Sequence, residues 1–197
     1  MKYEDKLISF LENNNGCILT RQFEEIGIPR VHIPQFIGKG IIRKAFRGMY
    51  VGENHIEDEY YFYQVNHSHT IFSHNTAFHL QNMTERTPHK MEITTYRGKN
   101  VSDKNNIKTY YVAKDKLYIG VIEVKSPYGN KVKTYNLERS ICDMIRYRND
   151  FDLEIYNKII KRFFSRKDKN LKRLLEYAKI FNISEKVNTI VEVMIKW

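Results

Sequence analysis

The sequence predicts an α+β protein with a small helix-rich domain at the N-terminus and a larger mixed domain after it. Two observations support this prediction. Within residues 1–52, three short helical patterns precede two strand patterns joined by a glycine turn. From residue 53, helix and strand patterns alternate to about residue 136, and the apolar spacing is then helical over 137–197. We therefore expect two domains, 1–52 and 53–197.

The first two helices of the N-terminal domain are predicted from apolar spacing and from their ends. The first covers residues 7–11 and ends at the polar run 13–16. Thr20 is a suitable N-cap for the second helix, in which Phe23 faces inward and which Gly27 terminates.

The third helix and a hairpin complete this domain. Pro29 opens a helix that ends near residues 38–40, and Pro34 must lie in its first turn or bend it, because proline cannot donate a backbone hydrogen bond. Strands over 41–46 and 49–51 then flank the turn Arg47–Gly48. Three helices followed by a hairpin is the order of a winged helix-turn-helix, which binds double-stranded DNA.

The second domain is predicted to hold a mixed sheet and a terminal helical bundle. Helices are expected over 60–65 and 74–81, the latter capped by Ser73, and a polar loop is expected over 98–106. Strands are expected at 70–72, 91–96, 110–113, 117–124 and 132–135, and breaks between the last helices near residues 149–150, 167–168 and 182–184.

Composition and charge limit the function classes. The 42% hydrophobic and 13% aromatic residues are enough for a packed core. The net charge of +10 indicates either a polyanionic partner or a well-solvated surface, and charge alone does not decide between them. Cys17 and Cys142 lie far apart in apolar surroundings, which favours buried thiols in a reducing compartment. Neither a signal peptide nor an apolar run of membrane-spanning length is visible, so we expect a cytoplasmic protein without membrane contact.

The candidate DNA-binding residues are polar side chains of the second helix, the third helix and the hairpin. Thr20 would offer a phosphate its hydroxyl and the nearby amides. Residues early on the third helix would reach base edges, and those of the hairpin would contact the DNA backbone or minor groove. Ordinary solvated charges, or a winged helix that only binds protein, are the alternatives. The set is Thr20, Arg21, Gln22, Arg30, His32, Gln35, Lys39, Arg43, Lys44 and Arg47.

A second basic cluster lies in the C-terminal helices. Its apolar residues are interleaved at helical spacing, so its cations form either a solvated face or a contact with RNA or DNA. The cluster comprises Lys158, Lys161, Arg162, Arg166, Lys167, Lys169, Lys172 and Arg173, against the single acid Asp168.

Two catalytic or metal-binding interpretations are weaker. Six of the seven histidines lie between His55 and His89, but they lack acidic residues at ligand spacing, so no metal or other cofactor is expected. Glu123 and Lys125 share one strand face, as in restriction-type nucleases, which also need an upstream aspartate such as Asp103 or Asp115. Because Glu-x-Lys is common by chance, we expect no enzyme.

Five blocks in order along nearly the whole chain carry a family resemblance. The blocks are Phe46–Val51, Ile71–Leu80, Arg86–Pro88, Ile93–Gly98 and Glu138–Asp143. The first resembles an R-G-x-Y wing ending, and the second resembles an S-x-x-T-A-x-x-L segment. Together the blocks resemble the AbiEi family of abortive-infection antitoxins, which belong to type IV toxin–antitoxin systems.

This resemblance implies an autoregulating antitoxin of phage defence. In the family, an N-terminal winged helix represses its own operon at promoter inverted repeats, and a C-terminal domain counters a nucleotidyltransferase-like toxin without a stable complex. Self-association on the DNA and a cytoplasmic location are expected, and the resemblance transfers no catalytic residue. A repressor whose C-terminal region senses a small molecule stays open as an alternative, since it would have a pocket with converging polar groups.

Overall fold

The computed structural model describes residues 2–99, 101 and 106–195 and divides into two compact units. Unit 1 comprises residues 1–66 together with 125–132, and unit 2 comprises residues 67–124 and 133–197. Unit 1 thus extends beyond Gly52, where the sequence places the end of the first domain, and it includes a distant segment of the chain. Both units mix helices and strands, in agreement with the predicted α+β class.

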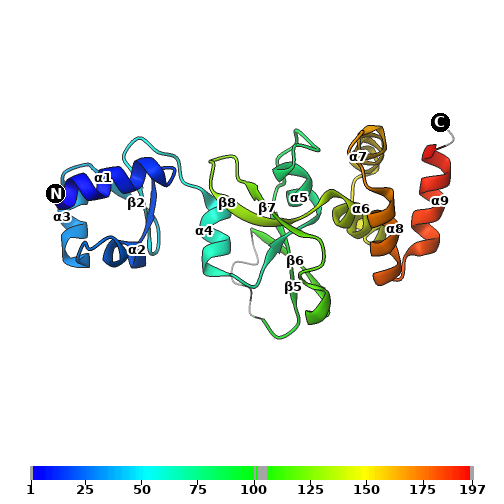
Figure 1. The fold of residues 1–197 in the computed structure, drawn as a ribbon, viewed down its shortest axis with the longest axis horizontal. Helices are drawn as coiled ribbons and strands as arrows, with labels where there is room; N and C mark the ends of the chain where they lie inside the picture. The colour runs from blue at the N-terminus through cyan, green and yellow to red at the C-terminus, as the bar shows by residue number, and fades with distance from the viewer. Residues whose placement is uncertain (1, 100, 102–105, 196–197) are drawn as a thin grey trace. The chain divides into compact units, whose positions relative to one another are not determined.

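Unit 1 has the predicted helices and hairpin together with a strand that the sequence analysis missed (Figure 1). That strand, β1, pairs with β3, so the hairpin becomes an antiparallel sheet of order β1-β3-β2. The elements are α1 (Tyr3–Asn13), β1 (Cys17–Leu19), α2 (Thr20–Glu25), the 3-10 turn η1 (Arg30–His32), α3 (Ile33–Gly38), β2 (Ile42–Phe46), β3 (Met49–Gly52) and α4 (Glu59–Asn66).

The core of unit 1 fixes the angle at which α2 and α3 meet the sheet. Leu7 and Leu11 of α1 pack with Phe23 of α2, Phe36 of α3 and Ile42 of β2, and all five are buried. Burial of one such side chain contributes about 1.5–3 kcal/mol to folding. The spacing that predicted the first and third helices therefore reflects this shared core.

A buried carboxylate ties α4 and the segment 125–132 into unit 1. Asp58 caps α4 by accepting a hydrogen bond from the amide of Tyr61 at 3.0 Å. Its other oxygen accepts hydrogen bonds from the hydroxyl of Ser126 and, at 2.8 Å, from the side-chain amide of Asn130. Since each oxygen has a donor, the burial of this charge is compensated.

Unit 2 contains most of a mixed sheet with the order β6-β5-β4-β8-β7. β5 and β6 run parallel, with Tyr96 opposite Val112 at their carboxyl ends, whereas β4 runs antiparallel to β5. The strands are β4 (Ile71–Phe72), β5 (Met91–Tyr96), β6 (Ile107–Val112), β7 (Val121–Lys125) and β8 (Lys131–Tyr135). The strand predicted over 117–124 begins only at Val121, because the 3-10 turn η2 (Lys114–Lys116) and a turn at Gly120 precede it.

The helices of unit 2 pack around one apolar cluster. Phe78 of α5 and Ile141 of α6 meet the aromatic Phe163 of α7 and Leu174 of α8 in it. The helices are α5 (His74–Leu80), α6 (Leu137–Arg146), α7 (Leu153–Ser165), α8 (Leu171–Ile180) and α9 (Ser184–Ile195), with the 3-10 turn η3 (Arg148–Asp150) between α6 and α7 (Figure 1). Within the described ranges, none of the helices has the length and apolar character needed to span a membrane.

Candidate nucleic-acid interface

The segment η1–α3 has a buried side and an exposed side. Ile33 and Phe36 face the core, while Arg30, Val31 and Gln35 are exposed. The helix predicted to open at Pro29 is divided into η1 and α3, and α3 begins only at Ile33. Pro34 therefore lies in the first turn of α3, one of the two predicted alternatives, where its missing amide hydrogen removes no hydrogen bond of the helix. Val31 is 77% exposed, an unusual position for an apolar side chain at the start of a helix.

The sequence analysis expected His32 to be exposed and to reach base edges, but its side chain does not project freely into solvent. Its ring lies 4.8 Å from the ring of Tyr3 and 6.5 Å from that of Phe36, so it is half-buried against α1. Together with Gln35 it lines a shallow hollow that Lys2 and Tyr3 border from the α1 side. The exposed face of η1–α3 therefore continues onto the start of α1.

The start of α2 differs from the prediction that Thr20 caps it. Leu19 is the N-cap, and its amide donates a hydrogen bond of 2.8 Å to the side-chain oxygen of Gln22. The amide of Thr20 donates to the carbonyl of Gly48 at 2.9 Å, which joins α2 to the tip of the β2–β3 hairpin. These two amides are thus already used within the fold, and Arg21 is the exposed polar side chain at this end of α2.

The β2–β3 hairpin presents cations on both sides of its tip. Lys44 and Arg47 are exposed, and the turn depends on Gly48, whose φ of +85° is strained for residues with a side chain. Arg43 instead forms an ion pair with Glu57 and donates to the carbonyl of His55 at 2.7 Å. The hydrogen bond from Arg43 lowers the pKa of Glu57.

Three of the predicted DNA-binding cations have acidic partners. Besides Arg43 with Glu57, the Arg30 guanidinium lies 3.0 Å from a carboxylate oxygen of Glu24, and Lys39 pairs with Glu4. Ion pairs between exposed side chains are weak and screened by salt. Within the described ranges, no side-chain hydrogen bond or ion pair involves Arg21, Lys44 or Arg47, which leaves these three available to phosphate.

The positive charge of the chain is not concentrated in unit 1. Unit 1 holds ten Lys and Arg against nine Asp and Glu, whereas unit 2 holds twenty-three against fourteen. The net charge of +10 is therefore almost entirely a property of unit 2. Unit 1 is therefore nearly neutral, and any polyanion that it binds would have to contact its few unpaired cations.

The second basic cluster lies on α7, α8 and the turn between them. Lys158, Lys161 and Arg162 of α7 and Lys172 and Arg173 of α8 are exposed. In the turn, Arg166 forms two hydrogen bonds of 2.9 and 2.6 Å with Asp168, and Lys169 donates to the carbonyl of Arg166 at 2.9 Å. Arg166 and Lys169 thus stabilise the turn, while Lys167 and the helical cations are exposed to solvent.

The residues of the nuclease interpretation are dispersed. Glu123 and Lys125 are both exposed on β7, as the alternation predicts. Asp115 lies in η2, and Asp103 lies outside the described residues. Over the ranges that the structure describes, no three His, Cys, Asp or Glu residues gather in a way that would hold a metal ion.

One histidine of the 55–89 group belongs to the core of unit 2. His74, with φ of +52°, stacks on Tyr110 at a ring distance of 3.4 Å, and its Nδ1 lies 2.9 Å from the hydroxyl oxygen of Ser73. Thr94 donates to the same hydroxyl at 2.9 Å. Burial lowers the pKa of His74 well below its ordinary value, with nearby cations as a smaller cause. This serine–histidine pair is sealed from solvent, which gives it a structural role.

The comparisons with known proteins identify the N-terminal region. Residues 5–51 match the family model described as "Transcriptional regulator, AbiEi antitoxin", which confirms the family resemblance for these residues. No curated protein gives a significant sequence match. The crystal structure of the RV2827C protein from Mycobacterium tuberculosis is similar, with a TM-score of 0.53 and 9% identity, over 96% of this chain and 80% of that chain. At this identity the similarity concerns the fold alone.

Proposed function

We propose, from the AbiEi match of residues 5–51, that this chain is an autoregulating antitoxin whose unit 1 is a winged helix that binds double-stranded DNA. The match carries the proposal, because this segment contains α2, η1 and α3 together with nearly all of α1 and of the β2–β3 hairpin. The order α1-β1-α2-η1-α3-β2-β3 supports it, since a wing that follows the third helix is the arrangement of this DNA-binding motif.

In the proposed complex, the exposed side of η1–α3 enters the major groove. Arg30 and Gln35 contact base edges, and the exposed Val31 contacts a thymine methyl group. Lys44 and Arg47 of the wing and Arg21 of α2 contact phosphates. Arg30 leaves Glu24 on binding, at small cost because both side chains are more than half exposed.

The second proposed role belongs to unit 2. By the family resemblance it counters a nucleotidyltransferase-like toxin without forming a stable complex with it, as in a type IV system. The repressor function places the protein at inverted repeats in its own promoter, where two copies bind adjacent half-sites. On this proposal the chain is a cytoplasmic regulator without enzymatic activity.

The experiment compares binding of the full chain to the promoter fragment upstream of its gene and to a scrambled fragment. We expect selective binding that weakens as the salt concentration rises. The Lys and Arg side chains of the protein release counterions that are condensed on the DNA, and added salt opposes this release. Gln35→Ala should weaken binding to the promoter alone, whereas Arg47→Ala should weaken binding to both fragments and reduce the salt dependence. Equal affinity for the two fragments, or affinity independent of salt, would contradict the proposal.

The antitoxin role is tested separately by co-expression with the toxin gene next to this one. The full chain should restore growth, and Arg47→Ala should restore it as well as the original sequence does, because that side chain belongs to the DNA-binding role. If the full chain fails to protect, the antitoxin role is wrong and the DNA-binding role is unaffected.

A further inference from the structure

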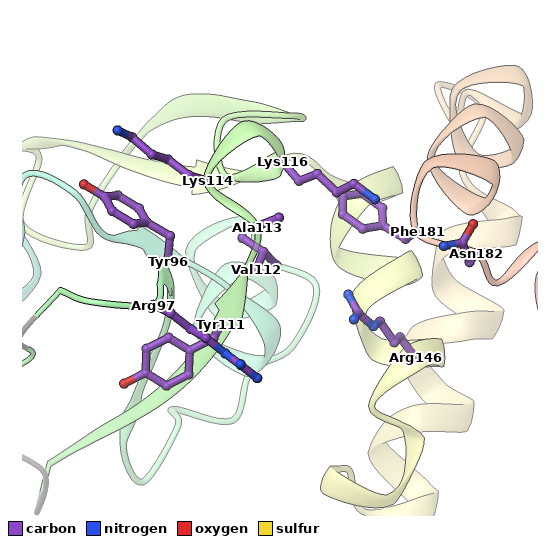
Figure 2. Close-up of a pocket in the computed structure, with 10 residues that line it drawn as sticks. All are labelled: Tyr96, Arg97, Tyr111, Val112, Ala113, Lys114, Lys116, Arg146, Phe181 and Asn182. Carbon is purple, nitrogen blue, oxygen red and sulfur yellow. The ribbon is translucent and has the colours of Figure 1, made fainter.

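Unit 2 contains a cavity at the carboxyl ends of its two parallel strands (Figure 2). It has a volume of about 610 Å³ and is bordered by the ends of β5 and β6, by η2, by the end of α6 and by the turn after α8. Ligands of α/β sheets bind where parallel strands end, because the loops and helix termini there leave a crevice. The volume is that of a small-molecule site.

Four cations line this cavity, and none of its described lining residues is acidic. Arg97 follows β5, Lys114 and Lys116 belong to η2, and Arg146 is the last residue of α6. Lys116 donates a hydrogen bond of 2.8 Å to the carbonyl of Ile180 and extends toward Phe181 in Figure 2. In the part of the chain that the structure describes, no ion pair joins Arg97 or Arg146 to an acid, so positive charge predominates in the lining of the cavity.

Three aromatic side chains line the same cavity. Tyr96 and Tyr111 come from the ends of β5 and β6, and Phe181 comes from the turn after α8. Tyr111 is 44% exposed, and in Figure 2 its ring turns away from Phe181 and Arg146 on the other wall of the cavity. Tyr96 already has Lys114 at 5.6 Å from its ring centre. Aromatic rings beside cations are the combination that binds bases and phosphates together.

A buried arginine holds one wall of this cavity in place. The Arg139 guanidinium stacks on Phe181 at 3.9 Å and donates to the carbonyls of Lys116 and Ile119 at 3.3 and 3.0 Å. It is fully buried and paired with Asp143 at 3.0 Å. Phe181 and η2 are therefore fixed relative to each other, so the cavity is formed before any ligand enters it.

We propose that this cavity binds a phosphorylated nucleoside, either a free nucleotide or the phosphorylated end of a single strand. The base stacks on the exposed ring of Tyr111, and the phosphates extend from there past Arg97 toward Lys116 and Arg146. A simple anion would use the cations but not the exposed ring, and an apolar ligand would leave Arg97 and Arg146 without partners. The site lies within unit 2, so the proposal is independent of DNA binding by unit 1.

The test is isothermal titration calorimetry of the full chain with ATP, with tripolyphosphate and with a 5′-phosphorylated single-stranded pentanucleotide. We expect ATP or the pentanucleotide to bind more tightly than tripolyphosphate. Tyr111→Ala should weaken that binding by roughly five-fold or more, as expected for loss of base stacking, while Tyr111→Phe keeps the ring and the affinity. Preference for ATP indicates a free nucleotide, and preference for the pentanucleotide indicates a strand end.

Matched charge variants separate the cavity from general attraction. Arg146→Gln should weaken binding of ATP and of tripolyphosphate, whereas Arg173→Gln, which removes an exposed cation of α8 outside the cavity, should leave both unchanged. Circular dichroism verifies that each variant is folded. The proposal is overturned if none of the probes binds, if tripolyphosphate binds as tightly as ATP, or if both charge variants weaken binding equally.

Discussion

The two units of this molecule use their charged residues differently. In unit 1 the cations of the proposed interface are few, and Arg30, Lys39 and Arg43 are paired with acids, so the unit is nearly neutral. Unit 2 carries almost the whole net charge, including an exposed cluster on α7 and α8 and an acid-free cavity. The net charge of the chain therefore does not point to unit 1, and our proposal that this unit binds DNA depends instead on the placement of its unpaired cations.

The largest expected effect concerns the buried ion pair of unit 2. Asp143→Ala leaves the Arg139 guanidinium buried without its carboxylate, since both side chains are at most 2% exposed. Removal of one partner from a buried pair costs about 3–5 kcal/mol, and we expect the free energy of unfolding to fall by that amount in urea titration. The double variant Arg139→Met/Asp143→Leu should recover most of the loss, and an unchanged stability of Asp143→Ala would show that the pair is not buried in solution.

The second effect is a pH dependence of unit 2 that arises from His74. Burial lowers its pKa in the folded state below 6.5, so the unfolded chain binds a proton that the folded chain does not. Stability is then fully present above pH 6.5 and is lost as the pH falls, by up to about 1.4 kcal/mol per pH unit.

Calorimetry between about pH 7.5 and 5.5 measures this loss, which is set by proton linkage. His74→Asn tolerates the positive φ and removes the titrating ring, so its stability should depend less on pH over the same range. Equal slopes for the two proteins would contradict the assignment to His74, since Glu92 and Asp143, whose pKa values burial raises, are present in both.

A smaller effect is expected at the wing of unit 1. Gly48→Ala places a side chain at φ of +85°, although a Cβ there would approach no atom closer than 3.8 Å. The cost is therefore that of the backbone conformation, about 1 kcal/mol of unfolding free energy. Gly38→Ala is the matched control, because Gly38 lies in α3 without a positive φ and with open space around its Cβ. Similar stability of the two variants would contradict the strained turn.

The smallest effect is a gain of function in unit 1. Glu24→Gln removes the acid that pairs with Arg30 and should tighten promoter binding about two- to three-fold at low salt, an effect of the size expected for an exposed ion pair. Glu12→Gln, which removes an exposed acid of α1 without an ion pair in the described part of the chain, is the control. A larger gain for Glu12→Gln would mean that the face with Arg30 does not meet the DNA.

The sequence predicted those parts of the fold that depend on local patterns. The spacing of Leu7 and Leu11, the glycine turn at Gly48 and the strand at 91–96 were identified because their signals lie within a few residues. β1 was missed because three buried residues form a strand only by pairing with β3, more than thirty positions later. The partners of Arg43 and Asp58 depend on similar long-range contacts.

The candidate sites differ in the same way. Exposed wing cations such as Lys44 and Arg47 could be identified from their positions in a hairpin. The contact of His32 with Tyr3 could not, since it depends on how α1 packs against η1. The cavity of unit 2 gave no sequence signal, because Arg97, Lys116, Arg146 and Phe181 lie on separate elements that only the fold brings together.

The most direct test of the account removes three exposed cations from one unit at a time. One variant carries Arg21→Gln, Lys44→Gln and Arg47→Gln in unit 1, and the other carries Lys158→Gln, Lys161→Gln and Lys172→Gln in unit 2, so both lose three exposed cations. Promoter affinity measured against salt concentration should fall for the first variant by roughly 100-fold or more, with a reduced salt dependence, and change little for the second. Loss of binding in the second variant alone would contradict the assignment of DNA binding to unit 1.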